Sequence, residues 1–102
     1  VWISFGSMIG YKAELQTGVV ITHGVIVGQH NVIERCAQVQ VGTTLGGNVT
    51  VRECATIHAG VTIIPRTEIG HDAIIGAGAV VTDSISACST AVGVPARVAK
   101  SR

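Results

Sequence analysis

The chain has 102 residues, of which 47% are hydrophobic, 13% are charged and three are aromatic. This length suggests one small domain, and the dominance of Val, Ile, Ala and Gly favours β-structure. A formal net charge of +1 without a basic run argues against nucleic-acid binding. There is no run of about 18 apolar residues and no signal-peptide pattern, so no membrane span or export is expected.

The cysteines Cys36, Cys54 and Cys88 are an odd set without a CxxC pair. Neither a disulfide framework nor a zinc site is predicted from this spacing. Reduced thiols are typical of the cytoplasm, so we expect a cytoplasmic protein. The chain begins at Val1 rather than Met, so a missing upstream segment is an open alternative.

A six-residue period starts at Ile3 and runs through most of the chain. Fifteen residues stand at this spacing from Ile3 to Ala87. The first fourteen are Ile, Leu or Val, and the last is Ala87. A second series, of mostly small residues, stands four positions after each residue of the first series. Helices have a period near 3.6 and simple strands a period of 2, so neither explains the pattern. The period predicts an all-β parallel β-helix with one large and one small inward residue per unit.

A longer period of 18 residues lies within the first. Glycine recurs at this spacing at Gly6, Gly24, Gly42, Gly60 and Gly78. Three six-residue units therefore form one coil, which predicts about five triangular coils over residues 1–92 with glycine at one corner. The second corner is predicted at Lys12, His30, Asn48, Arg66 and Ser84, and the third at Gly18, Cys36, Cys54, Asp72 and Thr90. Residues 93–102 lack the period and are predicted to form a C-terminal tail that packs on the last coil.

Two outward columns beside the glycine corner are largely apolar. One column is Val20, Gln38, Thr56, Ile74 and Val92, and the other is Met8, Ile26, Thr44, Thr62 and Val80. Apolar stripes on a small surface suggest subunit contact, so we expect the glycine corner to face another copy of the chain. The alternative, scattered exposed β-branched residues, stays open.

His23 is the candidate catalytic residue, because it heads a column of shrinking side chains just before the glycine corner. That column is Phe5, His23, Val41, Ala59 and Ala77. Alanine and glycine would leave a groove for a long, thin ligand such as coenzyme A, with an imidazole able to accept a proton at its end. His58 lies on the same face as His23 and could reach into the site of a neighbouring subunit. The alternatives that His23 is only a polar corner residue, and His58 only an exposed strand residue, stay open.

Two segments carry a family resemblance: the repeat at residues 75–80, IGAGAV, and the ending at residues 91–97, AVGVPAR. They resemble the left-handed β-helix acyltransferases with hexapeptide repeats, especially serine acetyltransferases and related sugar acetyltransferases. The resemblance implies a left-handed winding, acetyl-CoA as co-substrate, and homotrimers with active sites between subunits.

The resemblance also implies residue roles. His23 stands four repeats before the Leu45-Gly46-Gly47 element, as the family's general base does. The implied coenzyme A contacts are Ala59, Gly60, Ala77, Gly78, Pro95, Arg97 and Lys100. Thr22 replaces the Asp that precedes the base in serine acetyltransferases, and no loop follows Gly47, which favours a sugar acceptor. Glu34 and Gln40 are candidates for the partner that orients His23.

The sequence therefore predicts an acetyl-CoA-dependent O- or N-acetyltransferase that acts on a small sugar or amino-acid acceptor, without a metal. His30 and His71 are interpreted as solvated turn residues. One alternative is an enzyme like the γ-type carbonic anhydrases, which needs three converging histidines, two of them five residues apart; no such pair is present. The other is a non-catalytic, trimerising β-helix fragment.

Overall fold

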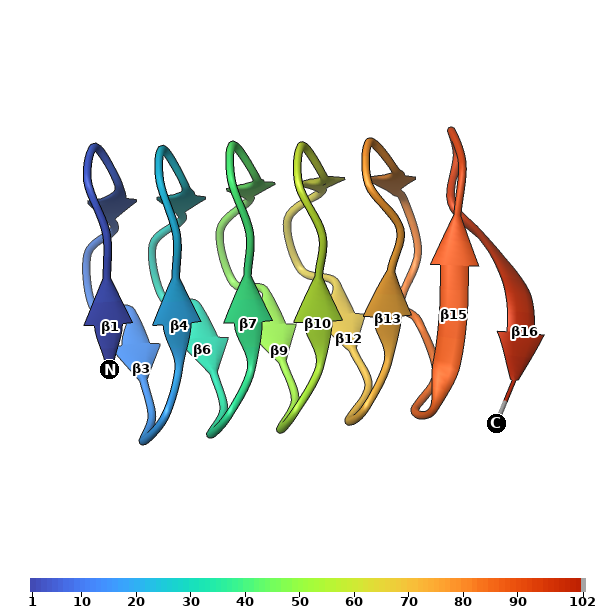
Figure 1. The fold of residues 1–102 in the computed structure, drawn as a ribbon, viewed down its shortest axis with the longest axis horizontal. Helices are drawn as coiled ribbons and strands as arrows, with labels where there is room; N and C mark the ends of the chain where they lie inside the picture. The colour runs from blue at the N-terminus through green and yellow to red at the C-terminus, as the bar shows by residue number, and fades with distance from the viewer. Residues whose placement is uncertain (102) are drawn as a thin grey trace.

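The chain winds into a three-sided parallel β-helix, seen in a computed structural model that describes residues 1–101, with side chains through Ala99. The body measures 31 × 23 × 21 Å, and these residues contain no helix. In Figure 1 the chain rises along the near face, crosses the top and descends behind while it advances toward the C-terminus. This is a left-handed winding, so the predicted fold is confirmed.

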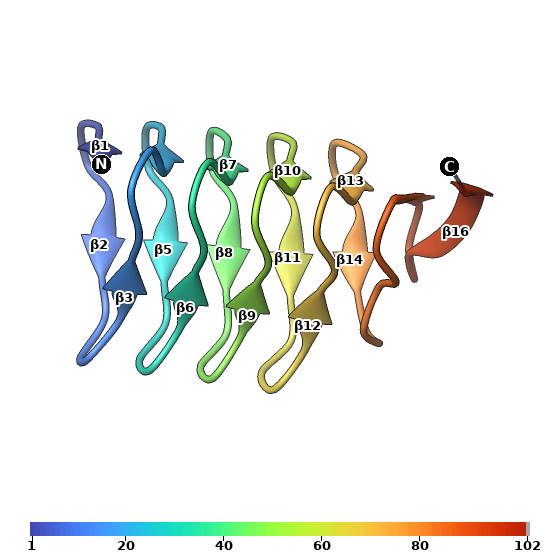
Figure 2. The same cartoon turned by 90° about the horizontal axis from the view of Figure 1, so that it is seen from below.

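Each wall of the prism is one sheet, and Figure 2 shows the second and third walls from below. The first sheet contains β1 (Trp2–Ile3), β4 (Val20–Ile21), β7 (Gln38–Val39), β10 (Thr56–Ile57), β13 (Ile74–Ile75), β15 (Ser89–Val92) and β16 (Arg97–Ser101). The second contains β2 (Met8–Ile9), β5 (Ile26–Val27), β8 (Thr44–Leu45), β11 (Thr62–Ile63) and β14 (Val80–Val81). The third contains β3 (Glu14–Leu15), β6 (Val32–Ile33), β9 (Thr50–Val51) and β12 (Glu68–Ile69).

Strands pair with the strand 18 residues away, as in Ile21 with Val39 and Ile57 with Ile75. The large residues of the six-residue series are buried from Ile21 to Val81, and the small series fills the space between them. Branched side chains in short strands and small ones at the turns together fill a narrow triangular interior. In the first coil, Ile3 and Ile9 are 46% and 38% exposed because they line the open end of the prism.

Polar residues in the small inward series link successive coils. The Ser7 hydroxyl donates to the Thr22 carbonyl at 2.6 Å and accepts from the Val25 amide at 3.2 Å. Thr43 makes the equivalent bond to the His58 carbonyl at 2.9 Å. These side chains satisfy backbone groups at the turns, where no strand partner is available.

The period slips by two residues after Val81. Ile69 bridges Ile85 and Ile75 pairs with Ala91, a spacing of 16 rather than 18 residues. The prediction of Ala87 as the last large inward position is therefore wrong: Ile85 is buried and Ala87 is exposed. The step from Val81 to the next large inward residue, Ile85, is four residues through a bend instead of the usual six through a turn. Every later residue therefore takes the place that the period predicts for the residue two positions after it.

The slip also changes one outward column, where Thr90 rather than Val92 stacks on Ile74. The tail then returns as β16, which pairs antiparallel with β15 and extends the first sheet by one strand. The division of the chain at residue 92 stays a prediction.

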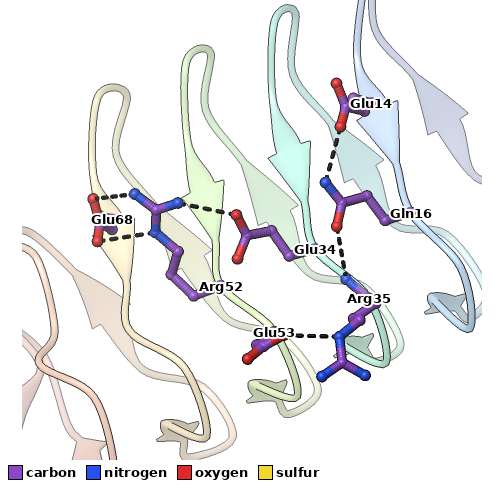
Figure 3. A network of polar contacts seen from close by, with 7 residues as sticks. All are labelled: Glu14, Gln16, Glu34, Arg35, Arg52, Glu53 and Glu68. Atoms are coloured by element: carbon purple, nitrogen blue, oxygen red, sulfur yellow. Dashed lines mark hydrogen bonds and ion pairs between the residues drawn. The ribbon is translucent and has the colours of Figure 1, made fainter.

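The third wall carries a network of charged side chains, shown in Figure 3. Arg52 bridges Glu34 at 2.9 Å and Glu68 at 3.1 Å, and Arg35 pairs with Glu53 at 2.8 Å near the adjoining corner. The carboxylates of Glu68 and Glu34 raise the pKa of Arg52 further above its usual value. This wall lies opposite the glycine corner, so the charged and apolar outer surfaces of the prism are segregated.

Candidate functional site

His23 lies in the exposed turn between β4 and β5, immediately before Gly24. The Gly24 amide donates to the Phe5 carbonyl at 3.1 Å, and the Gly42 amide donates to the His23 carbonyl at 3.0 Å. These bonds stack each turn on the next. The column thus has the order expected from the 18-residue period, and the catalytic role of His23 stays a prediction.

The imidazole of His23 contacts a hydroxyl that the sequence argument missed. The Ser4 Oγ atom lies 2.8 Å from Nδ1 of His23. If the hydroxyl accepts a hydrogen bond from Nδ1–H, the proton-accepting lone pair is left on Nε2. Ser4 lies beside Phe5, which stacks below His23, so inspection of diagonal neighbours in adjacent coils would have identified it.

The two partners expected for His23 are engaged elsewhere. Gln40 Oε1 lies 3.2 Å from Nδ1 of His58, and Glu34 pairs with Arg52. His58 is half-buried, and its ring contacts Gln40 on the preceding coil. Neither Gln40 nor Glu34 is therefore placed to orient His23, and Ser4 takes that position.

The predicted groove residues lie on the surface along the glycine corner. Ala59, Gly60, Ala77 and Gly78 are all exposed, and none packs into the core. Beyond the glycines the space is open: Cβ atoms built at Gly24, Gly42 and Gly78 meet no heavy atom of the described residues within 4 Å. Beyond His23 and the exposed Val41, the corner thus presents a strip of small, exposed residues from Gly42 to Gly78.

The C-terminal segment reaches the far end of this strip. The Ala96 amide donates to the Val80 carbonyl at 2.7 Å, which fixes the segment beside the strand that follows Gly78. Pro95 and Arg97 are exposed there. Lys100 is also expected to contact the cofactor, but its side chain lies outside the part of the chain that the structure describes. Its backbone belongs to β16 and pairs with Thr90 of β15.

The described histidines form no trio of the kind a γ-type carbonic anhydrase requires. Among the described residues one group offers three metal-ligating side chains, namely His71, Asp72 and Cys88. Within this group Oδ2 of Asp72 lies 3.0 Å from Nδ1 of His71, so the turn residue His71 has an acidic partner. A separate open depression of about 400 Å³ is lined by Glu68, Ser84, Ile85 and Ser86 at the shortened turn, away from His23.

Comparison with protein families identifies the repeat. Residues 48–83 match the family described as bacterial transferase hexapeptide (six repeats). A search of curated protein sequences finds no match. Among the described residues, no helix has the length and apolar character needed to cross a membrane.

Solved structures with this fold include several acetyltransferases. PerB from Caulobacter crescentus, in complex with CoA and GDP-perosamine, is 28% identical with a TM-score of 0.75, over 96% of this chain and 56% of that one. The acetyltransferase domain of PglB from Neisseria gonorrhoeae FA1090, in complex with acetyl coenzyme A, is 29% identical with a TM-score of 0.70, over 94% and 53%. Serine acetyltransferase from Brucella abortus strain S19 is 29% identical with a TM-score of 0.74, over 94% and 40%.

The chain thus spans about half the length, or less, of the solved structures it matches. The similarity nevertheless extends over nearly all of this chain, from the first coils to the tail. The resemblance to hexapeptide-repeat acetyltransferases, stated above from two short segments, is confirmed.

Proposed function

We propose that this hexapeptide-repeat β-helix, which resembles acetyltransferases in both sequence and fold, transfers an acetyl group from acetyl-CoA to an amine or hydroxyl. The acceptor would be a small molecule, a sugar or an amino acid, as in the solved relatives. The observation that carries the proposal is the strip of exposed glycine and alanine residues between His23 and the tail.

The recurrence of glycine at every turn of this one corner is not explained by contacts within the described residues. At the other two corners, eight non-glycine residues adopt a positive φ of 55–62°, so this turn tolerates side chains. At Gly24, Gly42 and Gly78 an added Cβ would meet nothing within 4 Å among the described residues. Internal packing therefore leaves room for larger residues, and a slightly smaller positive φ accommodates them at the other two corners. A ligand or neighbouring subunit that approaches the backbone closely accounts for glycine at every turn of one corner.

In the proposed reaction His23 is the general base. Its Nε2 accepts a proton from the acceptor amine or hydroxyl as that group attacks the thioester carbonyl. The tetrahedral intermediate collapses, the carbon–sulfur bond breaks, and coenzyme A leaves as a thiolate that takes up a proton. Ser4, by accepting from Nδ1–H, would hold the ring in the tautomer that this step needs.

Coenzyme A would extend from His23 along the strip past Ala59, Gly60, Ala77 and Gly78. The nucleotide end would then reach Pro95 and Arg97, where the guanidinium and Lys100 offer positive charge to its phosphates. Arg97 donates only to the neighbouring Ala96 carbonyl, at 3.2 Å, among the contacts of the described residues. Its remaining donors would be available to a phosphate.

The functional unit would be a homotrimer in the cytoplasm, with each strip covered by a neighbouring subunit. The exposed Met8, Ile26 and Val92 lie beside the glycine corner, with 66%, 43% and 44% of their surfaces accessible. Burial of these side chains between copies would stabilise the assembly. The neighbour would also supply one wall of the acceptor site.

The test compares the chain with its His23→Ala variant in acetyl-CoA turnover, measured as free thiol over a panel of amino sugars, sugars and amino acids. Loss of a general base is expected to lower kcat by about 10²–10⁴-fold, with coenzyme A binding retained. Equal turnover by the variant would refute the role of His23. Failure of coenzyme A to raise the melting temperature of either protein would favour a non-catalytic trimerising module; at 100 times its Kd, a ligand adds about 2.7 kcal/mol.

A further inference from the structure

The two-residue slip in the last coil places a thiol directly over a histidine–aspartate pair. The Cys88 amide donates to the His71 carbonyl at 2.9 Å, as the Asp72 amide does to the Glu53 carbonyl at 3.0 Å one coil earlier. Asp72 and Cys88 share the same left-handed turn geometry, with φ of 57° and 56°. An unbroken 18-residue period would have put Thr90 at this corner. The slip therefore replaces a hydroxyl by a cysteine at a position fixed by backbone hydrogen bonds.

The three side chains offer one ligand atom each, and these atoms all lie within 4.8 Å of one another. His71 and Asp72 are about half exposed, and Cys88 is half-buried. A tetrahedral zinc ion with bonds of 2.0–2.3 Å needs its ligand atoms roughly 3.3–3.8 Å apart. Small side-chain rotations on a fixed backbone would close the remaining gap.

We propose that His71, Asp72 and Cys88 form a binding site for Zn²⁺, with a water molecule as the fourth ligand. Nitrogen, oxygen and sulfur donors together favour zinc over magnesium or calcium, which prefer oxygen alone. Cys88 loses its proton to solvent on binding, so the thiolate and the carboxylate neutralise the charge of the ion. The open fourth position faces the exposed side of the corner.

The bound ion would cross-link the last coil of the β-helix to the coil before it. It joins residues 71 and 72 to residue 88, across the connection after Val81 where the six-residue period breaks. It lies at the third corner, separated from the glycine corner by one wall of six residues, at most about 20 Å. The ion is therefore assigned to stability of the last coil, and the assignment is independent of the proposed acetyl transfer.

The test uses the full chain without a histidine tag, stripped with chelator and kept reduced, and titrated with Co²⁺ as a spectroscopic substitute for Zn²⁺. The expected result is one equivalent bound, with a thiolate-to-cobalt charge-transfer band and visible bands of tetrahedral intensity that Zn²⁺ abolishes. Cys88→Ser should remove the charge-transfer band. Asp72→Asn and His71→Ala should each weaken binding at least about tenfold, because each removes one of three protein ligands.

Cys36→Ser is the matched control, since Cys36 occupies the same corner two coils before Asp72 with φ of 62°. It should bind Co²⁺ as the wild type does. Asparagine tolerates the left-handed turn, so Asp72→Asn should remain folded; melting curves of the metal-free variants check this. Zn²⁺ should raise the melting temperature of the wild type and of Cys36→Ser but not of Cys88→Ser. A charge-transfer band that survives in Cys88→Ser, or the absence of a band in the wild type, would overturn the proposal.

Discussion

The hydroxyl of Ser4 lies 2.8 Å from Nδ1 of His23, so residues from adjacent coils meet at the head of the glycine strip. When the hydroxyl accepts from Nδ1–H, the lone pair that can take a proton is on Nε2. Serine acetyltransferases place a carboxylate before the base, and here Thr22 donates its hydroxyl to the Val39 carbonyl instead, at 3.1 Å. A neutral hydroxyl on the preceding coil is thus the side chain that contacts the His23 ring, and its role as an orienting group is a proposal.

Substitution of Ser4 by Ala is expected to lower kcat about tenfold or less while the KM for acetyl-CoA stays the same. The reason is that loss of the acceptor at Nδ1 lets the ring change tautomer and orientation, whereas coenzyme A binding relies on other residues. The measurement is steady-state turnover as a function of pH, because a change in the ring's hydrogen bonding also shifts the pH profile. Ser4→Thr should restore activity, since it keeps the hydroxyl. A decrease in kcat without any change in the pH profile would contradict the positioning role.

An aromatic residue in the strip should block the cofactor without unfolding the chain. Ala77→Phe places a large ring on an exposed turn, so it should raise the KM or Kd for acetyl-CoA at least about tenfold while the melting temperature changes little. Thr17→Phe is the matched control, because Thr17 holds the equivalent exposed position before the third corner. Size-exclusion chromatography separates a direct effect from loss of assembly. Equal effects of the two variants would argue against a cofactor path along the glycine corner.

The sequence predicted the three-sided coil well because its signal is repeated from coil to coil, whereas the left hand of the winding was implied only by the family resemblance. One large residue every six positions defines both the strand and its inward face, and glycine every 18 positions defines the corner. Such a pattern leaves little freedom in register, since a shift by one residue would expose the whole apolar series. The exposure of Ala59 and Ala77 follows from the same periodicity.

Features that depend on a break in the period, or on diagonal neighbours, were not predictable in this way. Ile85 moved from the small inward series to the large one, and Cys88 moved above His71, because the connection after Val81 is two residues shorter than the others. Nothing in the local composition marks the deletion, since Ala87 fits an inward position as well as Ile85 does. The Ser4–His23 contact joins different columns, so a column-by-column analysis does not reveal it.

The register after Val81 can be tested by stability measurements at two positions. Ile85 is buried and bridges Ile69, so Ile85→Ala should lower the free energy of unfolding by about 2–5 kcal/mol. For a chain of this size the melting temperature should fall by about 10 °C or more. Ala87 is exposed, so Ala87→Ser should change stability by no more than about 0.5 kcal/mol. In an unbroken period both positions face inward, so a loss of stability in Ala87→Ser comparable to that in Ile85→Ala would support the unbroken period instead.

Asn31 is a buried polar residue at which a single change should stabilise the prism. Its Oδ1 accepts from the Val49 amide at 2.8 Å, while its Nδ2 has no hydrogen-bond partner among the described residues. Threonine occupies the corresponding inward position at Thr43, where the hydroxyl donates to the His58 carbonyl and accepts from the Val61 amide of the same turn. Asn31→Thr should therefore keep the acceptor for Val49 and remove the unsatisfied donor.

The expected gain is about 1 kcal/mol, or a rise in melting temperature of about 4–8 °C. Asn31→Val is the matched control: it has a similar size to threonine but no acceptor, so the buried Val49 amide loses its partner and stability should fall. Circular-dichroism melts of the two variants distinguish the contributions of the amide acceptor and the unpaired donor. A lower melting temperature for Asn31→Thr would mean that the asparagine amide nitrogen stabilises the fold, which contradicts its assignment as an unsatisfied group.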